Sequence, residues 1–243
     1  MNTKSFLQGS LAVDGFYCIW AHNKKTGHKP QKFYSDVGEL IDEATRLDTE
    51  GYDCYFALAS FINNTTRKVK NVSKLKSFFL DIDCGDGKDY TTQEDAIVAL
   101  QAFCKTLKLP RPILVNSGRG VHVHWQLAEP VVYDDWFPVA SRFKAMTKTH
   151  GLKCDHTVTS DAARIPTTHN HKTSPPSEVQ YFGTPRQEWV DFDAFSELLG
   201  NDPIPVPEKV IEEFSAVVQG LHSNKENYFK DIIVKTSKGE GCA

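Results

Sequence analysis

The chain has 243 residues and a formal net charge of −3 at pH 7. So small a charge excludes binding to nucleic acid through a generally basic surface and leaves only a local basic patch for such a partner. No apolar run reaches the roughly 18 residues of a membrane span, and the first residues lack the pattern of an export signal. We therefore expect a cytoplasmic protein with no membrane segment. The six cysteines include no CxxC pair, which argues against a zinc ribbon or a disulfide framework.

Hydrophobic periodicity predicts strands that alternate with helices, which indicates an α/β (α+β) domain. Apolar residues from Val37 to Leu47 form a helical stripe, which we expect Ser35 to cap and Gly51 to end. Thr91 and Glu94 match a capping box for a second helix, which ends before Pro110. A third helix is predicted over 136–146, and strands over 16–20, 55–61, 77–83, 113–115, 121–127 and, at a sheet edge, 179–182.

The composition changes after Gly200. Prolines alternate with other residues over 201–207, a pattern typical of a stiff linker, and apolar stripes over 210–218 and 229–233 predict two helices. The main domain is thus expected over residues 1–200. Residues 201–243 are expected to form a linker and a small helical appendage, the start of a truncated C-terminal region.

Asp81 and Asp83 follow the apolar run Phe78-Phe79-Leu80 and are one residue apart. Side chains on a strand alternate between two faces, so both carboxylates are expected on one face while Ile82 turns into the core. Two like charges held that close raise each other's pKa, and a divalent cation keeps both ionised. The pair therefore predicts a metal site.

A basic run precedes this strand. Its candidate DNA-binding residues are Arg67, Lys68, Lys70 and Asn71, and Lys74 and Lys76 continue the charge. Taken alone, such a run is as well explained by a solvated loop. Its position beside a candidate metal site favours contacts with a nucleic-acid backbone.

A glycine-rich turn lies between the two short strands that follow. Ser117, Arg119 and His122 occupy the sequence Ser-Gly-Arg-Gly-Val-His, where a backbone nest, a hydroxyl, a guanidinium and an imidazole converge on one anion. A triphosphate is the natural ligand for such a site. His124 lies on the same strand face as His122.

A third polar segment contains Asp155, Asp161, Arg164, Asn170 and Lys172. It offers another carboxylate for a metal ion and basic side chains for phosphate or template contacts. In isolation it is a weak signal, since polar loops of this composition are common.

In this order, the three segments resemble the archaeo-eukaryotic primase superfamily, and more narrowly the primase-polymerases of phages and plasmids. The resemblance covers about Arg67 to Lys172. It implies an RRM-like catalytic sheet packed with an N-terminal α/β unit. It also assigns the metal ligands Asp81, Asp83 and Asp155, the catalytic His122, and the nucleotide-binding residues Ser117, Arg119, His122, Arg164, Asn170 and Lys172.

The third segment departs from the family pattern, which commonly has two arginines and a glycine before the final threonine. This chain has only Arg164, and Thr167 stands where glycine is usual. Arg164 corresponds to either family arginine, depending on the alignment. The third metal ligand is Asp155 or Asp161, of which Asp155 better fits the end of a strand.

The resemblance implies a DNA primase-polymerase of phage or plasmid replication. Its cofactors would be two Mg²⁺ or Mn²⁺ ions, its substrates deoxyribonucleoside or ribonucleoside triphosphates, and its partners a single-stranded DNA template with a primer and a fused or associated helicase.

Three other interpretations share some of these residues. His122-Val123-His124 matches the His-hydrophobe-His site of nickases that cleave single-stranded DNA, although Tyr228-Phe229-Lys230 does not supply their tyrosine and lysine pattern. The run ending in Asp81 and Asp83 imitates the first motif of haloacid-dehalogenase phosphatases, but Cys84-Gly85 follows in place of Gly-Thr. The third interpretation is a catalytically silent DNA-binding domain, in which the aspartates are surface charges.

Overall fold

The computed structural model describes residues 1–156, 162–183 and 188–200. The predicted linker and helical tail lie outside the described residues. The helices are α1 (Thr3–Ser10), α2 (Val37–Thr49), α3 (Gln93–Leu107), α4 (Tyr133–Thr149) and α5 (Phe192–Leu198). The strands are β1 (Tyr17–His22), β2 (Gln31–Tyr34), β3 (Asp53–Ala57), β4 (Ala59–Phe61), β5 (Val72–Asp83), β6 (Ile113–Asn116), β7 (Gly120–Val132), β8 (Ala162–Arg164), β9 (His169–Asn170), β10 (Ser177–Glu178) and β11 (Gln180–Tyr181).

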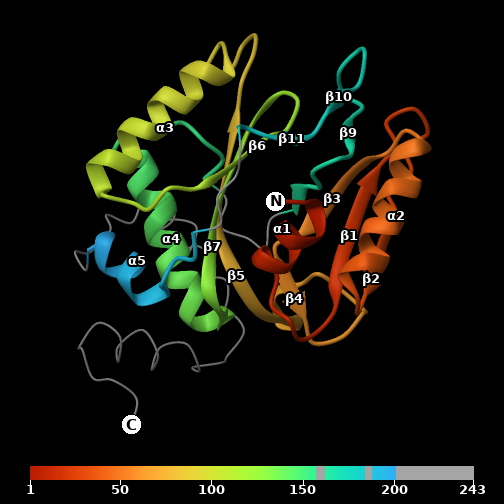
Figure 1. Ribbon diagram of the computed structural model, residues 1–243, viewed down its shortest axis with the longest axis horizontal. Coiled ribbons are helices and arrows are strands. Elements are labelled where there is room, and N and C mark those ends of the chain that lie inside the picture. Colours follow the sequence, from red (N-terminus) through yellow and green to blue (C-terminus); the bar gives the residue numbers. More distant parts are fainter. Residues whose placement is uncertain (157–161, 184–187, 201–243) are drawn as a thin grey trace, which may run out of the picture. The chain divides into compact units, whose positions relative to one another are not determined.

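Two larger antiparallel sheets form the framework (Figure 1). The first has the strand order β2-β1-β3-β8, and the second has the order β11-β6-β7-β5-β4. Strands β9 and β10 form a separate two-stranded pair. The long strands β5 and β7 at the centre of the second sheet carry the predicted metal and phosphate motifs.

The two faces of β5 pack into two different hydrophobic cores. Phe78, Leu80 and Ile82 are fully buried in a core with residues of α3, α4 and α5, and the ring of Phe78 stacks on Phe195 at 4.5 Å. Phe79, on the other face, joins a core with α1, α2 and the first sheet. In Figure 1, α3, α4 and α5 accordingly lie beside β5 and β7, away from α1.

The predicted helices over the two capping motifs exist, but their caps lie one residue further along the chain. The carboxylate of Asp36, and not Ser35, accepts hydrogen bonds from the backbone N–H groups of Gly38 and Glu39. Thr92 and Asp95 form the capping box of α3. Each acceptor satisfies amides that the first helical turn leaves without an intrahelical partner.

The predicted strand over 55–61 is wrong as a single element. The chain leaves β3 at Ala57 and begins β4 at Ala59, and the two strands belong to different sheets. The basic run is also more ordered than a loop, because a short 3-10 helix spans Val69–Asn71 and β5 already begins at Val72.

Sequence reasoning missed α1 and α5. A signal for α1 was present, since Asn2 and Ser5 form a capping box. The predicted edge strand over 179–182 is confirmed by β11, which lies at the edge of the second sheet. No helix in the described part of the chain is both long enough and apolar enough to span a membrane.

Candidate active site

Asp81 and Asp83 lie at the end of β5, as predicted. The alternation of the strand buries Ile82 completely and places the two carboxylates on the opposite face. The side chain of Asp81 is 39% exposed and that of Asp83 is 61% exposed. Both carboxylates are therefore open to solvent on one side and anchored by a buried strand on the other.

Asp155 lies directly beside Asp81, although the two are far apart in sequence. Its backbone N–H donates a hydrogen bond to the carbonyl oxygen of Asp81 at 2.8 Å. The buried Lys144 on α4 donates from Nζ to the carbonyl oxygen of Asp155 at 2.6 Å. These two bonds fix the backbone that carries the Asp155 carboxylate, whereas Asp161 lies outside the described residues.

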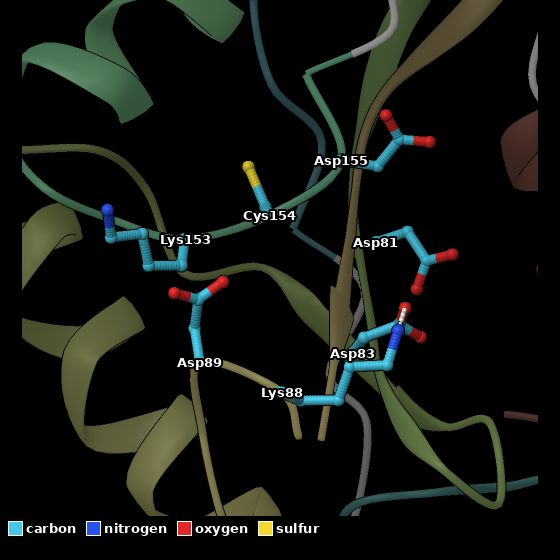
Figure 2. A pocket seen from close by; sticks show the side chains of 7 residues that line it. All are labelled: Asp81, Asp83, Lys88, Asp89, Lys153, Cys154 and Asp155. Carbon is cyan, nitrogen blue, oxygen red and sulfur yellow. Dashed lines mark hydrogen bonds and ion pairs between the residues drawn. The ribbon is translucent and has the colours of Figure 1, made fainter. Parts of the chain in front are cut away.

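The three aspartates share one cavity of about 290 Å³. In Figure 2 the side chains of Asp81, Asp83 and Asp155 extend to the same side of β5, and the side chains of Asp89 and Lys153 lie on the other side. Cys154 and Lys88 complete the lining. Within the described residues, no group of three or more His, Cys, Asp or Glu side chains is arranged to hold a metal ion by itself.

The cavity concentrates negative charge. Burial, followed by the neighbouring charges of Asp83 and Asp155, raises the pKa of Asp81 to about 6. Lys88 offsets part of this charge, since its Nζ lies 2.6 Å from Oδ2 of Asp83. Sequence reasoning missed Lys88, which comes from the loop after β5.

The glycine-rich turn joins β6 to β7 and lies against the end of β5. His122 pairs with Asp81 in the β5–β7 register, and its Nε2 lies 3.6 Å from Oδ1 of Asp81. Gly120 pairs with Asp83, and a Cβ at this position would lie 2.3 Å from the carbonyl oxygen of Ile82. Only glycine permits this close approach, which brings the turn to the carboxylates.

His122 is almost completely buried. Burial, and then the positive charge of Arg164, lowers its pKa to about 3, so its imidazole is neutral at pH 7. Its Nδ1 is buried and has no hydrogen-bond partner. The ring therefore presents Nε2 to the Asp81 side of the cavity as a neutral group.

His124 has a different environment from His122. Its ring is fully buried, contacts Phe6 at 5.0 Å and Phe79 at 4.9 Å, and has no hydrogen-bond partner for either nitrogen. A His-hydrophobe-His metal site needs both imidazoles at one ion, so this environment does not support the nickase interpretation. It agrees with the choice of His122 as the site histidine.

The third segment is attached to both the turn and the first sheet. Asn170 donates from Nδ2 to the carbonyl oxygen of Ser117 at 2.7 Å. Arg164 is 4% exposed and donates from Nη1 to Oδ1 of Asp53 at 2.9 Å. The charge of Arg164 opposes the rise in the pKa of Asp81 and adds to the fall in the pKa of His122.

Two aspartates that sequence reasoning missed hold this segment. Asp48 at the end of α2 accepts hydrogen bonds from the backbone N–H and Nδ1 of His169, both at 2.8 Å, and from Nε2 of His171 at 2.9 Å. Asp53 accepts from the backbone N–H of His171 as well as from Arg164. No local pattern reveals these contacts, because the partners lie more than a hundred residues apart.

The remaining predicted residues divide into exposed and buried groups. Arg119 at the tip of the turn, Lys172, Lys68 and Lys70 are exposed. Asn71 is buried, and its Nδ2 donates to the carbonyl oxygens of Asn63 and Thr66. These bonds and its burial keep the Asn71 side chain inside the loop.

The fold is that of the catalytic domain of archaeo-eukaryotic primases, as the sequence resemblance implied. The structure matches the archaeo-eukaryotic primase domain of the cyanophage S-2L primase-polymerase with a TM-score of 0.57 and 16% identity, over 77% of this chain and 90% of that one. It also matches the primase RepB', with a TM-score of 0.53 and 13% identity over 92% of this chain and 69% of that one. The catalytic domain of RepB' in complex with initiator DNA matches with a TM-score of 0.51 and 11% identity, over 93% of this chain and all of that one. The sequence matches no protein-family model and no curated protein.

Proposed function

We propose that the chain is a metal-dependent primase-polymerase that transfers nucleotides to a primer on a single-stranded DNA template. Its substrates would be deoxyribonucleoside or ribonucleoside triphosphates. The observation that carries this proposal is the meeting of three carboxylates, Asp81, Asp83 and Asp155, with the glycine-rich turn and its neutral His122. The primase fold of the described residues and the DNA-bound state of one structural neighbour support it.

The donor set fits Mg²⁺ or Mn²⁺, because hard cations prefer carboxylate oxygens. Mg²⁺ commonly binds through one or two carboxylates together with substrate phosphates, so the three aspartates need not enclose an ion by themselves. Asp81 and Asp83 would hold it, with Asp155 beside them. When bound, a pair of such ions lowers the pKa of the attacking hydroxyl and neutralises the charge that develops on the leaving pyrophosphate.

The protein's own groups bind and orient the triphosphate. The backbone N–H groups of Ser117 and Gly118 are already bonded within the turn, to the carbonyl oxygen of Gly120 and to Oδ1 of Asn116. A neutral His122 donates one hydrogen bond to a phosphate oxygen without carrying a charge. Arg119 is exposed at the tip of the turn, and Arg164 and Lys172 add positive charge from the third segment. These groups would hold the phosphates next to the carboxylates, where positioning supplies much of the rate.

Primer extension on a single-stranded template tests the proposal. The wild-type chain should extend a primer with Mg²⁺ or Mn²⁺ and fail with EDTA, and Asp81→Ala combined with Asp83→Ala should reduce extension by roughly a thousandfold or more. Asp134→Ala with Asp135→Ala, at the start of α4, removes two exposed carboxylates away from the cavity and is the matched control. Full activity of the Asp81/Asp83 variant would refute the proposal. An unprimed template in parallel shows whether the enzyme also starts chains.

A further inference from the structure

A row of four side chains crosses the first sheet from the basic loop to the candidate active site. In the strand register, Gln31 of β2 lies opposite Trp20 of β1, Trp20 opposite Tyr55 of β3, and Tyr55 opposite Arg164 of β8. Residues that are opposite one another in antiparallel strands project from the same face. The four side chains therefore stand side by side on one face.

The two aromatic rings lie next to each other in this row, with a cation on each side of the pair. The rings of Trp20 and Tyr55 lie 4.9 Å apart between their centroids and are tilted by 41°. Arg67 lies over the Trp20 ring at 5.8 Å, and its Nε donates to Oε1 of Gln31 at 2.8 Å. Arg164 lies over the Tyr55 ring at 4.7 Å, so each ring has a guanidinium beside it.

The opposite face of the same strands shows what ordinary packing in this sheet looks like. Ile19 and Ala21 of β1 and Cys54 and Phe56 of β3 are buried in the core with α1 and α2. Trp20 and Tyr55 remain half-buried, although large aromatic rings bury more apolar area than these neighbours. The two rings thus remain partly accessible to solvent, whereas the residues on the opposite face of the same strands are covered by helices.

The two ends of the row identify its ligand. At one end, the exposed Lys172 joins Arg164 beside the Tyr55 ring, with its Nζ 5.9 Å from the ring centroid. At the other end, Arg67 leads into the exposed Lys68 and Lys70. Phosphates of a nucleic-acid strand match these cations, and unpaired bases match the rings, because every base has a face that stacks on an aromatic side chain.

We propose that Trp20 and Tyr55 form a base-stacking platform for the single-stranded DNA template, with Arg67 and the exposed Lys68 and Lys70 holding the adjacent phosphates. This proposal deepens the function proposed above and rests on it for the identity of the strand. The platform binds without base readout, so its affinity is independent of sequence and falls with salt.

Binding of a fluorescein-labelled oligothymidylate to the full chain, without divalent ions, tests the platform. Trp20→Ala should weaken binding by about tenfold, the value of one lost stacking contact. The matched control is Trp189→Ala, because Trp189 is also an exposed tryptophan with a cation beside it, Lys76 at 4.8 Å. The control should bind like the wild type.

Two further measurements separate stacking from a change in folding. An oligonucleotide with abasic sites keeps its phosphates but lacks bases, so the wild type should bind it more than tenfold more weakly than oligothymidylate. For Trp20→Ala, which keeps only the Tyr55 ring, this difference should be about tenfold smaller. Oligothymidylate should also quench the tryptophan fluorescence of the wild type. Trp20→Phe, which keeps an aromatic ring, should retain most of the affinity and lose that quenching.

The platform is overturned if Trp20→Ala binds oligothymidylate like the wild type, if Trp189→Ala weakens binding equally, or if quenching persists in Trp20→Phe. The function proposed above fails separately, through the extension assay. The Asp81→Ala/Asp83→Ala variant should bind oligothymidylate normally while it fails to extend a primer. If the protein binds DNA through the platform but shows no metal-dependent extension, it is a DNA-binding domain. That result refutes the polymerase function and leaves the platform standing.

Discussion

Asp53 is the first residue of β3, and Asp81 lies near the end of β5. The charges that surround the two carboxylates are opposite. Asp53 is 1% exposed and pairs with Arg164. Asp81 is 39% exposed, and its nearest acidic neighbours, Asp83 and Asp155, raise its pKa. The carboxylate of Asp53 is neutralised by a side chain of the protein. The carboxylate of Asp81 lies among other carboxylates, and a bound cation would reduce their repulsion.

This difference separates an acidic group that is paired within the fold from one whose surroundings favour the binding of a cation. A buried carboxylate with a fixed guanidinium contributes to folding only as long as both partners remain, because removal of one leaves an unpaired charge. Carboxylates that repel one another in a cavity are tolerated at some cost in stability, and strongly perturbed pKa values of this kind are frequent at functional sites. Four variants test and sharpen the comparison.

Asp53→Ala should have the largest effect on stability. It leaves Arg164 buried without its carboxylate and removes an acceptor from the backbone N–H of His171, so we expect a loss of about 3 to 5 kcal/mol in the free energy of unfolding. Urea denaturation followed by circular dichroism measures it. Asp42→Ala, an exposed carboxylate on α2, is the control and should change little. A loss below about 1 kcal/mol in Asp53→Ala would show that the pair is not needed for the fold.

Asp48→Ala should affect nucleotide binding more than the fold. Asp48 holds His169 and His171, which flank Asn170, and Asn170 in turn holds the turn at Ser117. Without it, we expect the KM for the nucleoside triphosphate to rise by about tenfold with a smaller change in kcat, because ground-state and transition-state binding are lost together. Steady-state primer extension measures both constants. An unchanged KM would show that Asp48 does not position this segment.

The sequence predicted the local geometry of Asp81 and Asp83 correctly because its signals are local. A period of two places both carboxylates on one face, and the glycine-rich turn imposes its own geometry on a short stretch. The strand and the buried Ile82 follow from a few consecutive residues, whereas the proximity of His122 to Asp81 depends on the register of β5 and β7. Helix signals are also local, which is why α2 and α3 were predicted correctly, with caps only one residue from their observed positions.

The contacts of Asp48 and Asp53 could not be predicted in this way. Both are ordinary polar residues at the end of a helix and the start of a strand, and their partners are more than a hundred residues away. Their role depends on how the two sheets approach each other, which no window of consecutive residues encodes. For the same reason the row of Trp20, Tyr55 and Arg164 became visible only with the strand register.

Asp81→Asn should stabilise the metal-free protein at neutral pH. The folded-state pKa of Asp81, about 6, lies above the ordinary value of 3.8 for an aspartate. The protonated group therefore contributes stability that is complete below about pH 4 and is lost as the pH rises through about 6. After discounting for its partial exposure, we expect Asp81→Asn to gain about 1 kcal/mol at pH 7.5, or about 2 to 4 °C in Tm.

Thermal unfolding in EDTA between pH 4 and pH 7.5 measures this effect. The stability difference between Asp81→Asn and the wild type should grow through this range, whereas Asp86→Asn, an exposed carboxylate in the loop after β5, should leave the profile unchanged. An Asp81→Asn profile parallel to that of the wild type would contradict the raised pKa. Mg²⁺ should stabilise the wild type more than Asp81→Asn, because a ligand that binds the folded state raises its stability.

Lys88→Gln should have the smallest effect, and it should improve metal binding. The Nζ of Lys88 lies 2.6 Å from Oδ2 of Asp83, so this exposed lysine occupies an oxygen that a divalent cation would use. Exposed ion pairs are weak, and its removal should therefore strengthen the apparent affinity for Mn²⁺ by only roughly twofold to fivefold. Titration of Mn²⁺ against extension rate measures the change. Lys153→Gln is the control, because Lys153 lines the same cavity on the side away from the three carboxylates. It separates the effect of the Lys88–Asp83 ion pair from the effect of positive charge anywhere in the cavity. If both variants strengthen Mn²⁺ binding equally, the positive field of the cavity, and not the contact with Asp83, competes with the ion.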